Sequence, residues 1–179
     1  MINGMNGLIS LDPVLHLTAG PILRIRSPLS SFTHVFHSRY ASKEDLAAYA
    51  VHPTHVAMIK ANQPICEDVM AVDWVFDHAP DPQAGSAMRV TLFKLKEGVG
   101  EGVRGEILGS IKGLKDGFSC GENISPDRAK GFSIAALAVF QGVNEMEAVD
   151  AEFVVDLCKD KLQDYLDSFI VVDFLLPSP

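Results

Sequence analysis

Residues 42–55 read SKEDLAAYAVHPTH, and this stretch predicts two helices joined at a corner. Ser42 is a good N-cap, because its hydroxyl can accept hydrogen bonds from the free N–H groups of the first helical turn. Glu44 and Asp45 follow at the positive end of the helix dipole. Pro53 disfavours helical geometry at the preceding residue but suits the first position of a new helix. The corner is expected to bring three polar side chains close together: Tyr49, His52 and His55.

The composition around this corner is that of a soluble globular protein. The chain has 179 residues, of which 47% are hydrophobic and 21% are charged. A chain of this length can bury a sizeable core. The net charge is −8 and the sequence holds no cluster of Lys and Arg, so we expect no binding to nucleic acid or to an anionic membrane surface. No apolar run is long enough to predict a membrane span.

The three cysteines are far apart in the sequence and form no Cys-x-x-Cys pair, which favours a reducing compartment. We therefore expect a cytoplasmic location, with a plastid or peroxisome left open.

Hydrophobic periodicity predicts a series of strands and helices on both sides of the corner. The expected helices are 2–11, 43–51, a helix from about 53 that Pro64 interrupts, 101–115 and 145–167. The expected strands are 31–40, 69–76, 88–96, 117–119, 131–141 and 169–176. Residues 14–26 are expected to be extended, with a turn at Gly20-Pro21.

The chain contains an internal repeat. Phe-Thr-His at 32–34 matches Phe-Ser-Ile at 132–134, and Ala-Val-Asp-Trp at 71–74 matches Val-Val-Asp-Phe at 171–174, both with an offset of 100 residues. Upstream, Gly7-Leu8 matches Gly113-Leu114 with an offset of 106. The repeat predicts a first domain at 1–77 that lacks its opening strand, a linker at 78–86, and a complete second domain at 87–179.

A complete copy reads strand, helix, short strand, strand, helix, strand, which is the order of a ferredoxin-like α+β unit. Phe132 and Ile134 require the second face of the sheet to be covered as well. Two such sheets packed face to face would make a dimeric-type α+β barrel. The sequence thus predicts a homodimer or an intramolecular pseudo-dimer of the two copies.

Three motifs carry a resemblance to a known family: Phe-Thr-His at 32–34, Tyr-Ala-Val-His-Pro-Thr-His-Val at 49–56, and Val-Asp-Trp at 72–74. Together they resemble the plant stress-responsive A/B barrel (Dabb) domain, and more distantly one member, olivetolic acid cyclase, which is a polyketide cyclase. The resemblance implies a dimeric α+β barrel linked to stress or defence. No cofactor is expected from the residues; the resemblance alone raises a magnesium ion held by backbone carbonyls after the first helix.

The resemblance also implies roles for single residues. The candidate catalytic residues are His55 as general base, Tyr49 as proton donor to an enolate oxygen, and His34 as an orienting group on the strand. The candidate ligand-binding residues are His34, Phe36, Tyr49, His52 and His55. In the second copy, Ile134, Val149, Glu152 and Val155 stand at the corresponding positions, so no second site of this kind is expected there.

A purely structural reading of the same residues stays open. In it, His52 caps one helix and His55 bonds a backbone carbonyl, so that the histidines only shape a joint. His52 and His55 have no third ligand at a fixed spacing, and no metal site is predicted. His37 and Arg39 are expected on the other strand face, as helix-side or surface groups.

These observations lead to three hypotheses of function. The first is a stress-response protein that binds a small hydrophobic molecule or a partner without catalysis. The second is a polyketide-cyclase-like enzyme that closes a poly-β-keto chain by intramolecular aldol chemistry. The third is a structural half-barrel that assembles with another protomer.

Overall fold

The computed structural model describes residues 1–27, 32–76, 81–113, 118–149 and 164–177. Contacts divide the chain into two compact units. Unit 1 comprises Met1–Pro21 and Phe32–Val69, and unit 2 comprises Ile22–Ser31 and Met70–Pro179. The domain boundary predicted at 77/78 follows the sequence copies and stays a prediction.

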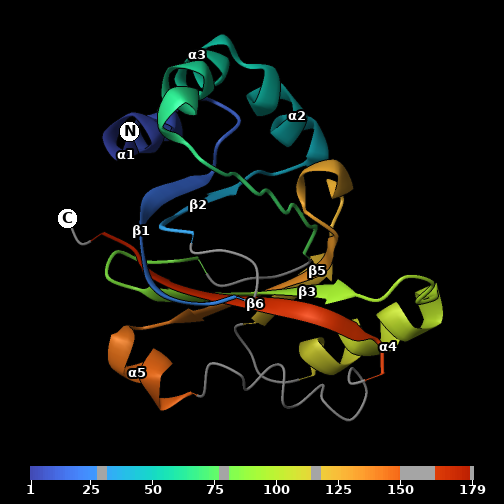
Figure 1. Cartoon of the computed structure of the whole chain (residues 1–179). Coiled ribbons are helices and arrows are strands. Elements are labelled where there is room, and N and C mark those ends of the chain that lie inside the picture. Colours follow the sequence, from blue (N-terminus) through green and yellow to red (C-terminus); the bar gives the residue numbers. More distant parts are fainter. Residues whose placement is uncertain (28–31, 77–80, 114–117, 150–163, 178–179) are drawn as a thin grey trace. The chain divides into compact units, whose positions relative to one another are not determined.

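Unit 1 joins a strand pair to a group of helices (Figure 1). The first part of β1 (His16–Arg26) pairs with β2 (His34–Arg39) in antiparallel register, with Leu17 opposite Ser38 and Thr18 opposite His37. The helical elements are α1 (Ile2–Gly7), η1 (Leu8–Ser10), α2 (Lys43–Val51), α3 (Pro53–Asn62) and η2 (Gln63–Ile65). Leu8, Val14, Leu17 and Tyr49 form the buried core between strands and helices.

Unit 2 contains the complete copy of the repeat. Its elements are β3 (Ala87–Leu95), α4 (Glu101–Lys112), β4 (Phe118–Glu122), η3 (Pro126–Arg128), β5 (Phe132–Phe140), α5 (Val143–Ala148) and β6 (Leu166–Leu175). These strands lie in the order β6-β3-β5-β4, and every neighbouring pair is antiparallel. This is the ferredoxin-like order, so the predicted α+β fold class is confirmed.

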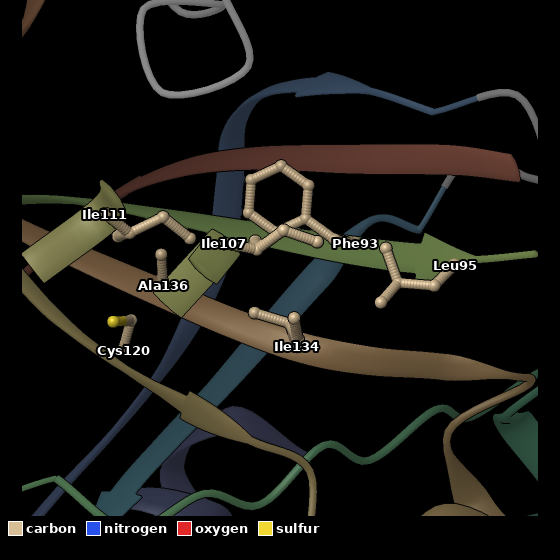
Figure 2. Close-up of a cluster of buried hydrophobic side chains, with 7 residues drawn as sticks. All are labelled: Phe93, Leu95, Ile107, Ile111, Cys120, Ile134 and Ala136. Carbon is tan, nitrogen blue, oxygen red and sulfur yellow. The ribbon is translucent and has the colours of Figure 1, made fainter. Parts of the chain in front are cut away.

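Both faces of this sheet are buried. On the helix side, the core beneath α4 consists of Phe93, Leu95, Ile107, Ile111, Cys120, Ile134 and Ala136 (Figure 2). On the opposite face, Ala135, Leu137, Ile170 and Phe174 are each at most 2% exposed. The second face is covered, as predicted, but the residues on which that prediction rested are a correction: Ile134 packs beneath α4, and Phe132 shares its face by strand alternation.

The turn predicted at Gly20-Pro21 is wrong, because β1 runs unbroken from His16 to Arg26. Pro21 is the last residue of β1 that pairs with β2, opposite His34, and from Ile22 the strand pairs with β6 instead. Proline has no N–H group to donate to a sheet, and Pro21 stands where the strand changes its pairing partner.

Two other predicted elements differ from the structure. Residues 69–76 form no strand; their one ladder contact is an isolated bridge between Trp74 and Asn123. The helix predicted for 145–167 is observed only as α5, while 150–163 lie outside the described residues and Leu166 already begins β6.

Two ion pairs within unit 2 cross between the sequence copies. Arg24 of copy one places its Nη2 2.7 Å from Oδ2 of Asp173 in copy two. Reciprocally, Arg128 of copy two places its Nη2 3.0 Å from Oδ2 of Asp73 in copy one. The two aspartates are the repeat-related pair, 100 residues apart. The end of one copy is thus paired with the middle of the other, which is the arrangement expected of a tandem pseudo-dimer.

Candidate functional site

The corner between α2 and α3 is built as the sequence predicts. The backbone N–H of Asp45 donates to Oγ of Ser42 at 3.0 Å, which satisfies a free donor of the first turn of α2. His52 has an extended backbone (φ −61°, ψ 132°) and ends α2, and Pro53 opens α3. Nδ1 of His52 accepts a hydrogen bond from the N–H of Thr54 at 3.2 Å, so the imidazole is the N-cap of α3.

Three rings gather on the inner side of this corner. The ring centroids of Tyr40 and Tyr49 are 5.2 Å apart, and those of Tyr49 and His55 are 4.3 Å apart. Tyr49 is 4% exposed and belongs to the core of unit 1. Burial, and then the neighbouring Tyr40, raise the pKa of the Tyr49 hydroxyl above its ordinary value. Tyr49 is therefore a neutral phenol at physiological pH.

His55 is fixed by a backbone contact. Its Nδ1 lies 3.1 Å from the carbonyl oxygen of Ala50, and this contact requires the Nδ1–H tautomer, because a carbonyl oxygen can only accept. Nε2 is then the ring atom left with a lone pair. The structural reading, in which His52 caps a helix and His55 bonds a carbonyl, matches both observed contacts.

His34 and Phe36 do not join this ring cluster. His34 begins β2, is exposed, and has its Nδ1 2.9 Å from Oγ1 of Thr33. A strand rises about 3.3 Å per residue, so His34 lies roughly 17 Å along β2 from Arg39. Tyr40, whose ring belongs to the cluster, is the residue after Arg39. Phe36 is 37% exposed. The structure thus brings Tyr49, His52 and His55 to one corner and leaves His34 at the other end of the strand.

A second polar group lies on the strands of unit 1, and its burial was not expected. His37 and Arg39 are 9% and 7% exposed, and the rings of His37 and His16 are 5.3 Å apart. Leu17 of β1 packs with Tyr49 on the helix side and lies opposite Ser38 of β2. Because neighbouring residues of a strand point to opposite faces, His37 and Arg39, on either side of Ser38, lie on the face away from the helices. The prediction that His37 and Arg39 are helix-side or surface groups is wrong. Burial, with the nearby Arg39 and His16, lowers the pKa of His37 to about 3.

The positions in copy two that correspond to the corner carry no equivalent chemistry. Ile134 is fully buried in the core beneath α4, and Val149 follows the end of α5. Glu152 and Val155 lie outside the described residues. Among the positions that the structure describes, the polar corner is found in copy one, and the absence of a second corner stays a prediction.

Neither a metal cluster nor a membrane-spanning helix is found in the described part of the chain. Within these ranges no three side chains of His, Cys, Asp or Glu are grouped so that they could hold a metal ion. No helix there has both the length and the apolar character required to cross a bilayer. Magnesium binding by backbone carbonyls stays a prediction.

Comparison with known proteins gives one family over both copies of the repeat. The family model described as the stress responsive A/B barrel domain matches residues 1–76 and again 88–176. A stress-response A/B barrel domain-containing protein of Arabidopsis thaliana is 53% identical over 99% of this chain and 72% of its own length. A second Arabidopsis thaliana protein of the same description is 49% identical over 99% of this chain and 87% of its own length.

Among solved structures, a protein from Fusobacterium nucleatum described as a "putative monooxygenase" has a TM-score of 0.61. It is 14% identical and covers 97% of this chain and 81% of its own, which is a likeness of fold alone.

Proposed function

Because this chain belongs to the stress-responsive A/B barrel domain family, we propose that it is a stress-response protein that binds a small hydrophobic molecule without catalysing its reaction. The observation that carries the proposal is the cluster of Tyr40, Tyr49 and His55 at the α2–α3 corner. Aromatic rings provide apolar faces for a ligand together with a polar edge that can fix its orientation.

The surroundings of the ring cluster suit a ligand with an apolar body and one polar group. Leu11, Tyr40 and Met58 are half-buried at the border of the core, where an apolar molecule would gain contacts by covering them. Nε2 of His55 keeps a lone pair that can accept a hydrogen bond from a hydroxyl group. A phenol with an alkyl chain has this combination of groups.

The arrangement favours binding over catalysis for two reasons. His34, the third member of the candidate catalytic set, is exposed at the far end of β2. Tyr49 is almost fully buried, and a proton donor has to be within hydrogen-bond distance of the substrate oxygen. Tyr49 and His55 alone do not provide the complete set.

Binding is tested with 4-pentylphenol as the probe, by following backbone amide signals in NMR during a titration. We expect the largest shifts at residues around Tyr49 and His55. Met58→Glu should weaken binding about tenfold, since it places a charge at the apolar border. Ile59→Glu is the matched control, because Ile59 is 46% exposed on the same helix. Equal effects of the two substitutions would reject this site.

The second candidate function is the cyclase-like reaction, which the adjacency of Tyr49 and His55 favours. The Nδ1–H tautomer of His55 leaves Nε2 as a base, as proton abstraction next to a carbonyl group would require. The experiment is incubation with a linear poly-β-keto thioester. Cyclised product that forms with the native chain and not with His55→Ala would replace the binding proposal with this one.

A further inference from the structure

Ser125 lies directly before Pro126 in the loop that joins β4 to β5, at a partly exposed position. Ser125 itself is half-buried, and the next two residues, Pro126 and Asp127, are exposed. The serine hydroxyl makes no capping hydrogen bond to η3, the turn that follows it. A serine followed by proline is the acceptor sequence of proline-directed protein kinases, and the acceptor hydroxyl has to be accessible, as it is here.

The same loop holds the segment around Asp73 in place. The N–H of Ile124 donates to the carbonyl oxygen of Asp73 at 2.8 Å, and the N–H of Ala71 donates to the carbonyl oxygen of Arg128 at 3.1 Å. The side chains add an ion pair, in which Nη2 of Arg128 lies 3.0 Å from Oδ2 of Asp73. The loop residues that make these contacts lie within three positions of Ser125, so a new charge at Ser125 would act on the contact directly.

Arg128 is placed to meet a phosphate group on Ser125. The N–H of Arg128 donates to the carbonyl oxygen of Ser125 at 3.4 Å, which closes the 3₁₀ turn. Side chains three residues apart in such a turn lie on the same side of it. The side chain of Arg128 is largely exposed, so its guanidinium group can change partner without leaving a buried site. A phosphate dianion offers this group three acceptor oxygens and more charge than the carboxylate of Asp73 does.

We propose that Ser125 is a phosphorylation site and that its phosphate takes Arg128 away from Asp73. A proline-directed protein kinase transfers the γ-phosphoryl group of ATP to Ser125. The bond from the γ-phosphorus to the oxygen that bridges it to the β-phosphate breaks and releases ADP. A bond from phosphorus to Oγ of Ser125 forms, and the hydroxyl proton goes to a base of the kinase. The phosphate then binds the guanidinium group, which loosens the segment around Asp73 from the loop.

The site is tested by incubating the folded chain with a proline-directed protein kinase and ATP, and by mapping the phosphate with mass spectrometry. We expect phosphate at Ser125 in the native chain. Ser27→Ala is the matched control, because Ser27 is also followed by proline, and this variant should still be modified at Ser125. A folded chain that takes up no phosphate at Ser125 would overturn the proposal.

The effect of the phosphate is tested by hydrogen–deuterium exchange, followed by NMR at the amides of Ala71 and Ile124. These two N–H groups donate across the contact, so their exchange reports whether the contact is held. We expect phosphorylation to speed their exchange about fivefold, the scale expected for the loss of an exposed ion pair, while the amides of β3 keep their rates. Unchanged exchange at Ala71 and Ile124 in the phosphorylated chain would also overturn the proposal.

Arg128→Gln tests whether the phosphate acts through the guanidinium group. This variant lacks the ion pair with Asp73 from the start, so phosphorylation should change exchange at Ala71 and Ile124 by less than about twofold. Lys130→Gln removes a positive charge from the same loop and is the matched control, with the response of the native chain expected. Equal acceleration by phosphate in Arg128→Gln and in the native chain would reject Arg128 as the partner of the phosphate, and the proposal with it.

Discussion

The guanidinium group of Arg89 on β3 binds the carboxylate of Asp173 on β6 through two hydrogen bonds inside unit 2. Nε lies 2.7 Å from Oδ1, and Nη2 lies 3.2 Å from Oδ2. The side chains are 3% and 1% exposed. The same guanidinium group donates to the carbonyl oxygens of Met146 and Val149 at the end of α5. The ion pair therefore ties the central strands of the sheet to a helix end.

Removing the carboxylate of this pair should destabilise the chain strongly. Asp173→Asn leaves a buried arginine without its counter-charge, and we expect a loss of about 3–5 kcal/mol in the free energy of unfolding, measured in urea. The repeat provides the control: Asp73→Asn breaks a pair whose arginine, Arg128, is 61% exposed, and should cost less than about 1 kcal/mol. Similar losses at both positions would contradict this interpretation.

Stability should depend on pH through His37. Its pKa is about 3 in the folded chain against an ordinary 6.5, so the unfolded state binds a proton that the folded state does not between these values. The contribution of His37 to stability is fully present above about pH 6.5. Below that pH, the free energy of unfolding should fall by about 1.4 kcal/mol per pH unit as the pH drops toward 3.

The variant His37→Gln should flatten the part of the pH profile that His37 contributes. Denaturant unfolding at a series of pH values measures the slope. His34→Gln, at the exposed start of the same strand, serves as the control. A slope that is unchanged in His37→Gln would show that His37 does not cause the pH dependence.

A methyl group at Gly121 should disturb the contact between β4 and the segment around Trp74. A Cβ atom there would lie 2.5 Å from the carbonyl oxygen of Val75 and 3.2 Å from Cβ of Trp74. We expect Gly121→Ala to cost about 1–3 kcal/mol in unfolding experiments. Gly102→Ala is the matched substitution, since nothing lies within 4 Å of that Cβ in α4, and it should be neutral or stabilising by up to about 1 kcal/mol.

Phe132→Ala should cost about 3–5 kcal/mol, because the ring is 1% exposed and its removal leaves a cavity in the sheet core. Thermal or urea unfolding measures the loss. Phe36→Ala, at a residue that is 37% exposed, should cost much less. A loss below about 1 kcal/mol at Phe132 would refute its placement in the core.

Local signals in the sequence were enough to predict the helix corner. Ser42 and Pro53 act on the backbone within a few residues of their own positions, and both have the predicted roles. The apolar run of β5 predicted a strand buried on both faces, and the structure confirms it. The offset of 100 residues also related Asp73 to Asp173, and the structure shows each of them in an ion pair with an arginine of the other copy.

Features that depend on the pairing partner were not predictable from one segment alone. Residues 69–76 have the alternation of a strand, but a ladder also needs a partner in register, and only Trp74 has one. Alternation along β2 separated His34 from His37 correctly. It could not tell which set is buried, because that follows from the register of Leu17 with Ser38 and from the packing of Leu17 beneath α2.

The crossed pairs Arg24–Asp173 and Arg128–Asp73 bear on how this gene can change over generations. Each copy encodes half of each pair, so a recombination breakpoint between the copies would separate both arginines from their aspartates. A half exchanged alone would keep the crossed pairs only if the incoming half carried the matching arginine and aspartate. The two aspartates differ in this respect, because Asp73 is paired with Arg128 of the opposite half, whereas Asp173 is paired with Arg24 of the opposite half and also with Arg89 of its own half.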